Sequence, residues 1–187
     1  MRFFLAIPLN QPVNDALDAW LQQAGLLHPV RVVPRENRHI TIQFFGEIGE
    51  VLAAAIIRLV GEYCSTCVQG PPGGLEVAGI GFFPAEETPK ILWAGVRDKH
   101  GWLVEFAAGI ATRLETLGVY RDSPAWRPHV TLARCPGMSA IRAAELCSHN
   151  TATGFGSILP VSVVAYQSIL RPQGAAYTAL SGYTPGA

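Results

Sequence analysis

One pattern occurs twice in this chain, once in each half: a histidine two positions before a threonine, inside an apolar stretch. It reads His39-Ile40-Thr41 in the first half and His129-Val130-Thr131 in the second. The β-branched and aromatic residues around both triplets favour strand over helix. Side chains of a strand alternate between its two faces, so we expect Gln43 on the histidine face and Phe44 on the buried face with Ile40. Each triplet therefore predicts a strand with one buried and one polar face.

A lone triplet of this kind is compatible with an ordinary histidine on a half-exposed strand, but two in matched surroundings favour a shared site. Two histidines near their unperturbed pKa can hold opposite protonation states at neutral pH, and so supply the base and the acid of a hydrolysis. Thr41 and Thr131 place a hydroxyl beside each imidazole. Two hydroxyls and an imidazolium suit an anion with several oxygens, so a phosphate or cyclic phosphate is the expected ligand.

A strand, an amphipathic helix and a polar-faced strand follow one another in each half. The first set covers 2–7, a helix that Asn10 caps, and 39–45; the second covers 91–96, 102–117 and 129–133. The other segments predict helices over 50–63 and 140–147 and strands over 32–33, 75–83, 161–170 and 176–180. The chain should therefore form one α+β domain over residues 1–187, with an internal duplication whose motif strands lie near 39–45 and 129–134. We expect antiparallel sheets in two lobes around a shared cleft.

Several kinds of site are disfavoured by the residues. Neither motif strand carries Asp or Glu on the histidine face, so we expect no metal. No Gly-rich phosphate loop or dinucleotide fingerprint is present, so we expect no nucleotide cofactor. Cys64 and Cys67 have the spacing of a redox or zinc pair, but no second pair accompanies them, and we expect reduced thiols. Because no apolar window is long enough for a membrane span and residues 1–8 are too short for a signal peptide, we expect a cytoplasmic protein.

The charges balance to zero, which argues against a protein that coats nucleic acid along its length. Half of the arginines nevertheless lie near the two triplets, at Arg31, Arg35, Arg38, Arg121, Arg127 and Arg134. They predict either a local anion site or ordinary solvated and ion-paired arginines. Arg134 follows the second triplet on the same strand, but its parity places it with the buried Val130 unless the strand bulges there.

The segments His39-Ile40-Thr41-Ile42 with Phe44-Phe45-Gly46, and His129 to Arg134, resemble the two signatures of the two-histidine phosphoesterases. Within that group they are most similar to the bacterial and archaeal RNA 2',3'-cyclic phosphodiesterases, also called 2'-5' RNA ligases. The resemblance implies a bilobal α+β fold of two pseudo-symmetric lobes, with outer helices around a central cleft and no metal. It also implies that His39 donates a proton to the leaving ribose oxygen, that His129 accepts one from water, and that Thr41 and Thr131 hold the phosphate.

The expected activity is metal-independent hydrolysis of an RNA-terminal or nucleoside 2',3'-cyclic phosphate to a 2'-phosphate, with 2'-5' ligation of RNA ends as the reverse reaction. Gln43, Phe45 and Arg134 are candidates for further substrate contacts, and Gln43 stands where the family often has an apolar or basic residue. Two alternatives stay open: ADP-ribose 1'',2''-cyclic phosphate as substrate, or binding of an AMP-like nucleotide without turnover. The expected partners are RNA ends or nucleoside cyclic phosphates, with no membrane and no obligate protein partner, and we expect a monomer.

Overall fold

The computed structural model describes residues 1–26, 30–67, 70–84, 89–120, 126–159, 161–172 and 174–185. Its strands form one antiparallel sheet in the order β7-β4-β5-β6-β3-β1-β8-β9, with β2 paired to β6. The strands are β1 (Arg2–Pro8), β2 (Arg31–Val32), β3 (His39–Glu47), β4 (Leu75–Phe83), β5 (Ile91–Arg97), β6 (His129–Arg134), β7 (Gly154–Ile158), β8 (Val163–Arg171) and β9 (Gly174–Tyr183). The helices are α1 (Gln11–Gln23), η1 (Arg35–Asn37), α2 (Glu50–Cys67), α3 (Trp102–Leu114), η2 (Glu115–Leu117) and α4 (Ala140–His149).

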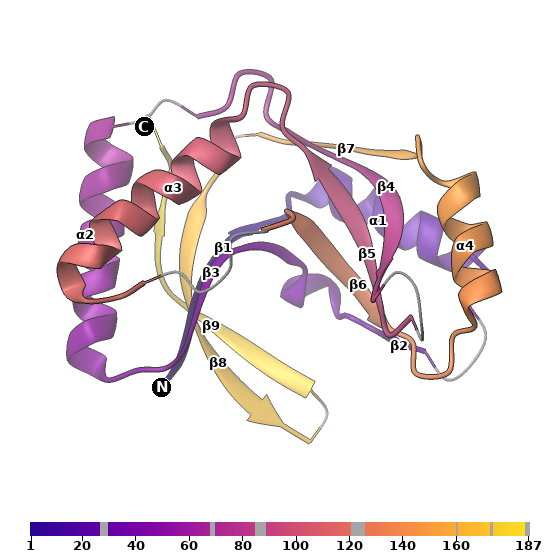
Figure 1. Ribbon diagram of the computed structural model, residues 1–187, viewed down its shortest axis with the longest axis horizontal. Helices are drawn as coiled ribbons and strands as arrows, with labels where there is room; N and C mark the ends of the chain where they lie inside the picture. Colours follow the sequence, from indigo (N-terminus) through magenta and orange to yellow (C-terminus); the bar gives the residue numbers. More distant parts are fainter. Residues whose placement is uncertain are drawn as a thin grey trace.

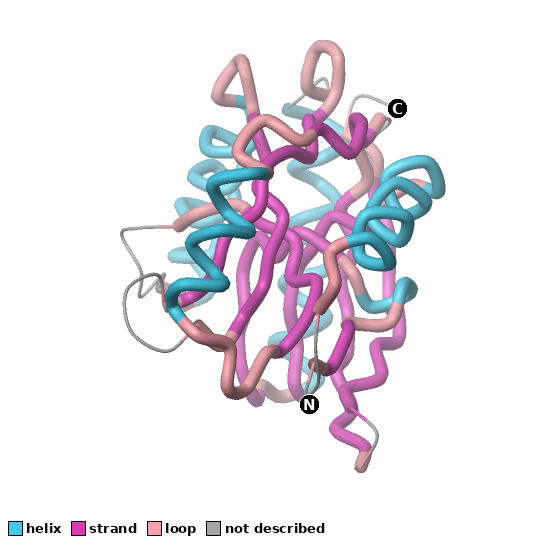
Figure 2. Tube along the Cα trace, turned by 90° about the vertical axis from the view of Figure 1, so that its right-hand side faces the viewer, coloured by secondary structure: helices cyan, strands magenta, loops and turns pink. Residues whose placement is uncertain are grey.

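The sheet consists of two halves that meet at β3 and β6, the strands that carry the two triplets. One lobe contains β3, β1, β8 and β9, and the other contains β6, β5, β4 and β7. In Figure 1, α2 and α3 lie beside the first lobe, and α1 and α4 lie beside the second. Figure 2 shows the strands passing through the middle of the molecule with helices along the outside. The α+β class and the antiparallel sheet predicted from the sequence are confirmed.

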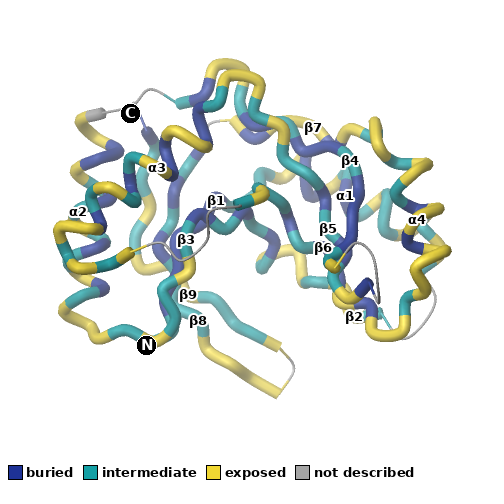
Figure 3. Tube along the Cα trace, viewed as in Figure 1, coloured by how far each residue is buried: buried dark blue, intermediate teal, exposed yellow. Residues whose placement is uncertain are grey.

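Two helices each pack on the lobe that does not contain the strand preceding them in the chain. Helix α1 follows β1 in the chain but packs against β7, where Trp20 meets Phe155 edge-on. Helix α3 follows β5 but packs against α2, where Phe106 stacks on Tyr63. Figure 3 shows the buried residues concentrated in the strands and on the helix faces turned toward them. Because each lobe is covered by a helix that follows a strand of the other lobe, we expect the two lobes to fold together.

Most element boundaries agree with the sequence. Asn10 caps α1, its side-chain oxygen accepting from the Val13 N–H at 3.2 Å, and the helix that starts at Trp102 ends at Gly118 in the left-handed conformation with φ 72°. Helix α2 continues past the predicted end at Tyr63. Strand β7 was not predicted, because its sequence Gly-Phe-Gly-Ser-Ile is short and contains two glycines, and pairing with β4 stabilises it. No helix of the described residues is long and apolar enough to cross a membrane.

Candidate active site

The two triplets lie side by side at the centre of the sheet. Strands β3 and β6 run antiparallel with Ile40 opposite Val130, and both side chains are completely buried. The residues on either side of this pair must point to the other face of the sheet, and they are His39, Thr41, His129 and Thr131. By the same register, each histidine lies across from the threonine of the other strand. The four predicted residues are thus brought together on one face.

Both histidines are oriented by the same kind of hydrogen bond. Nδ1 of His39 donates to the Asn37 carbonyl at 2.8 Å, and Nδ1 of His129 donates to the Arg127 carbonyl at 2.8 Å. A ring nitrogen that faces a carbonyl must carry the proton, so the neutral form of each ring is the Nδ1–H tautomer. Nε2 is then the atom that can exchange a proton with a ligand. Nε2 of His39 lies 3.1 Å from the Thr41 hydroxyl oxygen.

Aromatic side chains of the first lobe surround His39. The centroid of Phe4 lies 5.0 Å from the imidazole, and Tyr177 meets the ring edge-on at 5.4 Å. Burial lowers the pKa of His39; the hydrogen bond to the Asn37 carbonyl acts in the opposite direction, and the charge of His129 lowers it further. The protein groups around the ring therefore favour a neutral His39. The interaction with His129 also places the two imidazoles within electrostatic reach of each other.

The second lobe surrounds His129 with a different aromatic pair and leaves it partly exposed. Phe83 meets the ring edge-on at 5.1 Å, and the Trp93 centroid lies 6.2 Å away. The indole of Trp93 lies against Gly81, where a Cβ would approach the ring carbon Cζ2 to 2.1 Å, so glycine is required there. The guanidinium of Arg127 lies over the same indole at 5.3 Å. A cation is therefore held beside His129.

A β-bulge after the second triplet turns Arg134 toward the site. Trp93 pairs with Thr131 and Ile91 pairs with Arg134, so β6 has one more residue than β5 between these two pairs. Because Trp93 and Ile91 are two positions apart, they point to the same face, and so do their partners Thr131 and Arg134. Regular strand alternation would have placed Arg134 on the face of the buried Leu132. The sequence analysis allowed for a bulge that would change this, and the structure contains one.

The electrostatics of Tyr177 agree with this position of Arg134. Burial raises the pKa of the Tyr177 phenol, and the positive charges of Arg134 and Arg2 act in the opposite direction. Tyr177 belongs to β9 of the first lobe, so the charge of Arg134 extends across the junction toward His39. Among the residues that the structure describes, no carboxylate lies within ion-pairing distance of Arg134.

A bulge at the same position follows the first triplet, and it overturns the predicted face of Phe44. Ala6 of β1 pairs with Thr41 and Phe4 pairs with Phe44, so Ile42 is the extra residue and Phe44 shares the face of Thr41. Phe44 is accordingly 49% exposed, and its ring lies 6.5 Å from that of Phe4. The alternation read from the sequence was wrong at Gln43 and Phe44, because a bulge shifts the residues that follow it to the opposite face.

The same bulge changes the faces of Gln43 and Phe45. Gln43 pairs with Leu5, a core residue, and therefore no longer shares the face of Thr41 as predicted. Phe45, a candidate substrate contact from the sequence, packs against Phe3 with centroids 5.3 Å apart. Both residues nevertheless border a groove on the surface.

This groove, here called the β3 groove, has a volume of about 630 Å³ and runs along β3 where β6 diverges from it. Its lining residues are Thr41, Ile42, Gln43, Phe44, Phe45, Ile48, Gly118, Val119, Tyr120, Trp126 and His129. The Trp126 indole N–H donates to the Thr41 carbonyl at 3.1 Å and ties the segment after α3 to the open edge of the strand. Exposed aromatic rings at Phe44 and Tyr120 therefore lie next to the paired triplets.

Two of the three arginines that precede the first triplet, Arg35 and Arg38, do not belong to this site, whereas Arg31 of β2 pairs with Arg134 in the sheet. Arg38 is buried and pairs with Asp18 of α1 at 2.6 Å, while Arg35 pairs with both Asp15 and Asp18. These ion pairs fasten the η1 segment to α1. Arg121 lies outside the described residues.

The sequence also raised the cysteine pair, Cys64 and Cys67, and metal binding. Cys64 is buried on α2, and the side chain of Cys67 lies outside the described part of the structure. Within the described ranges, no group of three or more His, Cys, Asp and Glu side chains could hold a metal ion. The role of the pair stays a prediction.

The comparison with known proteins agrees with this geometry. The model of the 2'-5' RNA ligase superfamily matches residues 13–151. The chain belongs to the 2'-5' RNA ligase superfamily. RNA 2',3'-cyclic phosphodiesterase from Aeropyrum pernix is 33% identical over 153 residues, which cover 81% of this chain and 84% of that protein. The enzyme of the same name from Archaeoglobus fulgidus is 29% identical over 177 residues, covering 95% and 96%.

Two solved structures share the fold. TT0787 of Thermus thermophilus superposes with a TM-score of 0.81 at 25% identity, covering 99% of this chain and 98% of that one. LigT of E. coli, solved in complex with 3'-AMP, superposes with a TM-score of 0.77 at 19% identity and covers 100% of this chain and 98% of its own. The whole two-lobed arrangement is therefore shared with these two proteins.

We predict that His39 makes the stability of the protein depend on pH. Its pKa is lowered in the folded state, so the unfolded chain takes up a proton at higher pH than the folded chain does. The free energy of unfolding should have its full value above about pH 6.5, the ordinary histidine pKa, and decrease as pH falls toward the lowered pKa. Urea unfolding of wild type and His39→Gln across this range measures the effect. The variant should lose this part of the slope, and equal slopes would contradict the assignment.

Proposed function

We propose that this protein hydrolyses RNA-terminal 2',3'-cyclic phosphates to 2'-phosphates without a metal ion. The observation that carries the proposal is the pair of imidazoles on adjacent antiparallel strands, each with Nδ1 held by a carbonyl and with a threonine hydroxyl across the strand junction. Relatives named RNA 2',3'-cyclic phosphodiesterase, aligned over most of the chain, support the choice of substrate.

In the proposed reaction the cyclic phosphate lies over the paired triplets, with the Thr41 and Thr131 hydroxyls donating to its non-bridging oxygens. Nε2 of His129 takes a proton from water while the water oxygen forms a bond to phosphorus. The bond from phosphorus to the ribose 3'-oxygen breaks, and Nε2 of His39 gives that oxygen a proton. The products are a 2'-phosphate and a free 3'-hydroxyl. A 5'-hydroxyl of RNA in place of water would give a 2'-5' bond by the same proton transfers.

The donor role of His39 requires its protonated form, whereas the protein groups around the ring lower its pKa. An anion beside an imidazole favours the imidazolium, so binding of the negatively charged substrate raises the pKa of His39. Substrate binding then brings the proton that the leaving oxygen later receives. Without a bound anion, burial alone would favour His39 as the base. The role of His39 as the proton donor therefore depends on the phosphate of the substrate.

The remaining candidates define the surroundings of the phosphate. Arg134 is assigned to the substrate because its bulge turns it to the site face and because its charge extends toward Tyr177. Gln43 and Phe45 are assigned to the nucleoside through the β3 groove that they border. Binding of an AMP-like nucleotide without turnover is less well supported, since both histidines and both threonines are present and share one face.

Replacement of either catalytic histidine should remove most of the activity. His39→Ala and His129→Ala each delete one proton-transfer partner, so kcat with a nucleoside 2',3'-cyclic phosphate should fall by about 100-fold or more. His149→Ala is the matched control, because His149 also bonds a carbonyl through Nδ1 but lies on α4. The assay contains EDTA, and circular dichroism checks the fold. Near-full activity in either variant, or an activity that a divalent ion restores, would overturn the proposal.

Arg134→Gln should weaken catalysis through the phosphate. Loss of a hydrogen bond to a charged group costs about 1.5–3 kcal/mol, so kcat/KM should fall by about 10- to 100-fold. Arg142→Gln on α4, whose arginine pairs with Glu145, is the control and should retain wild-type kinetics. If both variants had the kinetics of wild type, Arg134 would have no part in binding substrate.

A further inference from the structure

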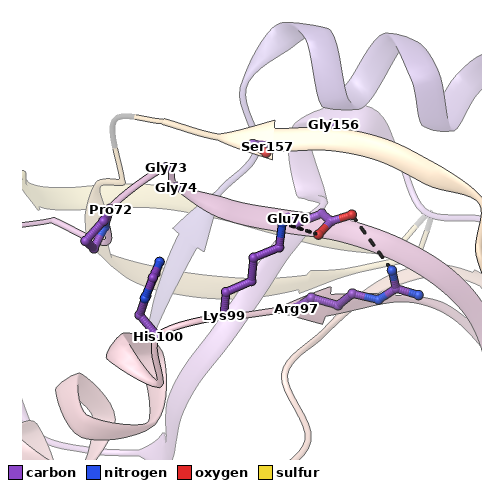
Figure 4. Close-up of a pocket in the computed structure, with 9 residues that line it drawn as sticks. All are labelled: Pro72, Gly73, Gly74, Glu76, Arg97, Lys99, His100, Gly156 and Ser157. Carbon is purple, nitrogen blue, oxygen red and sulfur yellow. Dashed lines mark ion pairs between the residues drawn. The ribbon is translucent and has the colours of Figure 1, made fainter.

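A second depression, here called the basic pocket, has a volume of about 640 Å³ and lies where β4, β5 and β7 meet the start of α3. Figure 4 shows its side chains, with the amine of Lys99 and the guanidinium of Arg97 on either side of the Glu76 carboxylate. The lining residues are Pro72, Gly73, Gly74, Glu76, Arg97, Lys99, His100, Gly156 and Ser157. Nothing in the proposed reaction uses any of them.

The strand register places this pocket on the same face of the sheet as the catalytic histidines. Gly95 of β5 pairs with His129, and Arg97 lies two positions further along β5, so both point to the face of His129. Arg97 pairs with Glu76 of β4, and Glu76 pairs with Ser157 of β7. One row of side chains therefore crosses β5, β4 and β7 on that face.

The row lies at a distance that a short single strand of RNA can span. Two strand spacings of about 4.8 Å and two residues of about 3.3 Å separate the backbones of His129 and Glu76, which gives roughly 12 Å. The path between them stays on one face of the sheet. The pocket lies on the side of His129, the residue proposed to activate the attacking hydroxyl.

The cations of the pocket are available to an anion. The ion pairs of Glu76 with Arg97 and Lys99 are long, at 3.8 and 3.9 Å, and the two basic side chains are 50% and 78% exposed. Exposed pairs of this kind contribute little, so an anion can compete for their cations. Arg97 is also positioned by donating to the Thr151 carbonyl at 2.9 Å. His100 adds a third group that carries positive charge when protonated.

Glycines form the opposite wall of the pocket. A Cβ on Gly74 would lie 2.5 Å from the Ile158 carbonyl oxygen, and its φ is 79°, so only glycine fits there. Gly73 and Gly156 add further wall without side chains. Walls of this kind allow a backbone and a phosphate to approach closely.

We propose that the basic pocket binds a backbone phosphate of an RNA strand whose end reacts at the catalytic pair. The inference rests on the proposed function and adds a second contact to it. The phosphate belongs either to the strand that ends in the cyclic phosphate or to the strand whose 5'-hydroxyl attacks in ligation. The chemistry of recognition is the same for both, and the strands can be separated by experiment.

The first test compares substrates of different length. In Arg97→Gln/Lys99→Gln, kcat/KM for a nucleoside 2',3'-cyclic phosphate should equal that of wild type. If the pocket binds the strand that ends in the cyclic phosphate, kcat/KM for an oligoribonucleotide with that end should fall by about 5-fold or more at low salt, because two cationic contacts to its backbone phosphate are lost. Arg58→Gln/Arg142→Gln removes two arginines that pair with carboxylates on α2 and α4, and it should leave both substrates unaffected.

A second variant should change RNA binding in the opposite direction. Glu76→Gln removes the negative charge from the pocket, so it should lower KM for whichever of the two RNA strands the pocket binds and leave the mononucleotide unchanged. Because an effect of misfolding would not improve binding, this variant separates a charge effect from damage to the fold.

Ligation identifies the strand. If the oligonucleotide is hydrolysed normally by the double variant but KM for a 5'-hydroxyl strand in ligation rises, the pocket binds the attacking strand. If hydrolysis of the oligonucleotide is impaired, it binds the strand with the cyclic phosphate. Unchanged kinetics in both reactions would overturn the proposal.

Failure of the proposed function would be visible separately. Wild type would then not turn over even the mononucleotide. Fluorescence anisotropy with a labelled oligoribonucleotide would still report the pocket, because the slope of log Kd against log salt should decrease by about 0.7 in the double variant, the value for one phosphate of a single strand. Equal slopes in wild type and variant would reject RNA binding at this pocket.

Discussion

The pairing of Ile40 with Val130 is the contact on which the rest of the site depends. These two completely buried residues hold β3 beside β6 and so join the lobes. A strand cannot bury one residue without turning its neighbours to the other face. The apolar pair thereby presents two histidines and two threonines together. Beyond this pair β3 and β6 separate, and the β3 groove opens beside Thr41 and His129.

The two lobes are similar in structure but surround their histidines with different side chains. Both imidazoles have the same hydrogen bond at Nδ1 and both are partly exposed, but Phe4 and Tyr177 surround His39, whereas Phe83 and Trp93 surround His129. The same bulge after each triplet presents Phe44 in one lobe and Arg134 in the other. One repeated structure can therefore place different side chains against the two sides of a bound phosphate. The internal duplication itself stays a prediction. The observed order of the strands in the sheet is the order that such a duplication would produce.

The sequence was sufficient for the fold class, the motif strands and the shared face of His39 and His129, because strand alternation is a local property. It was insufficient beyond each triplet, since a bulge depends on the partner strand and reverses the faces of Gln43 and Phe44. Tyr177 and Trp126 were not predicted at the site. They come from distant segments, and no local pattern marks them. The expected arginine cluster did not form as one group. Arg35 and Arg38 are held by carboxylates on α1, a segment that no local pattern connects with them.

The dependence of kcat/KM on pH, measured in EDTA for wild type and both histidine variants, tests the acid–base pair most directly. Wild type should give a bell-shaped curve whose limbs belong to the coupled pair. His129→Ala, which lacks the base, should retain only the limb that falls as pH rises, and His39→Ala, which lacks the acid, should retain only the limb that rises. Two unaltered bell-shaped curves would contradict proton transfer by these histidines.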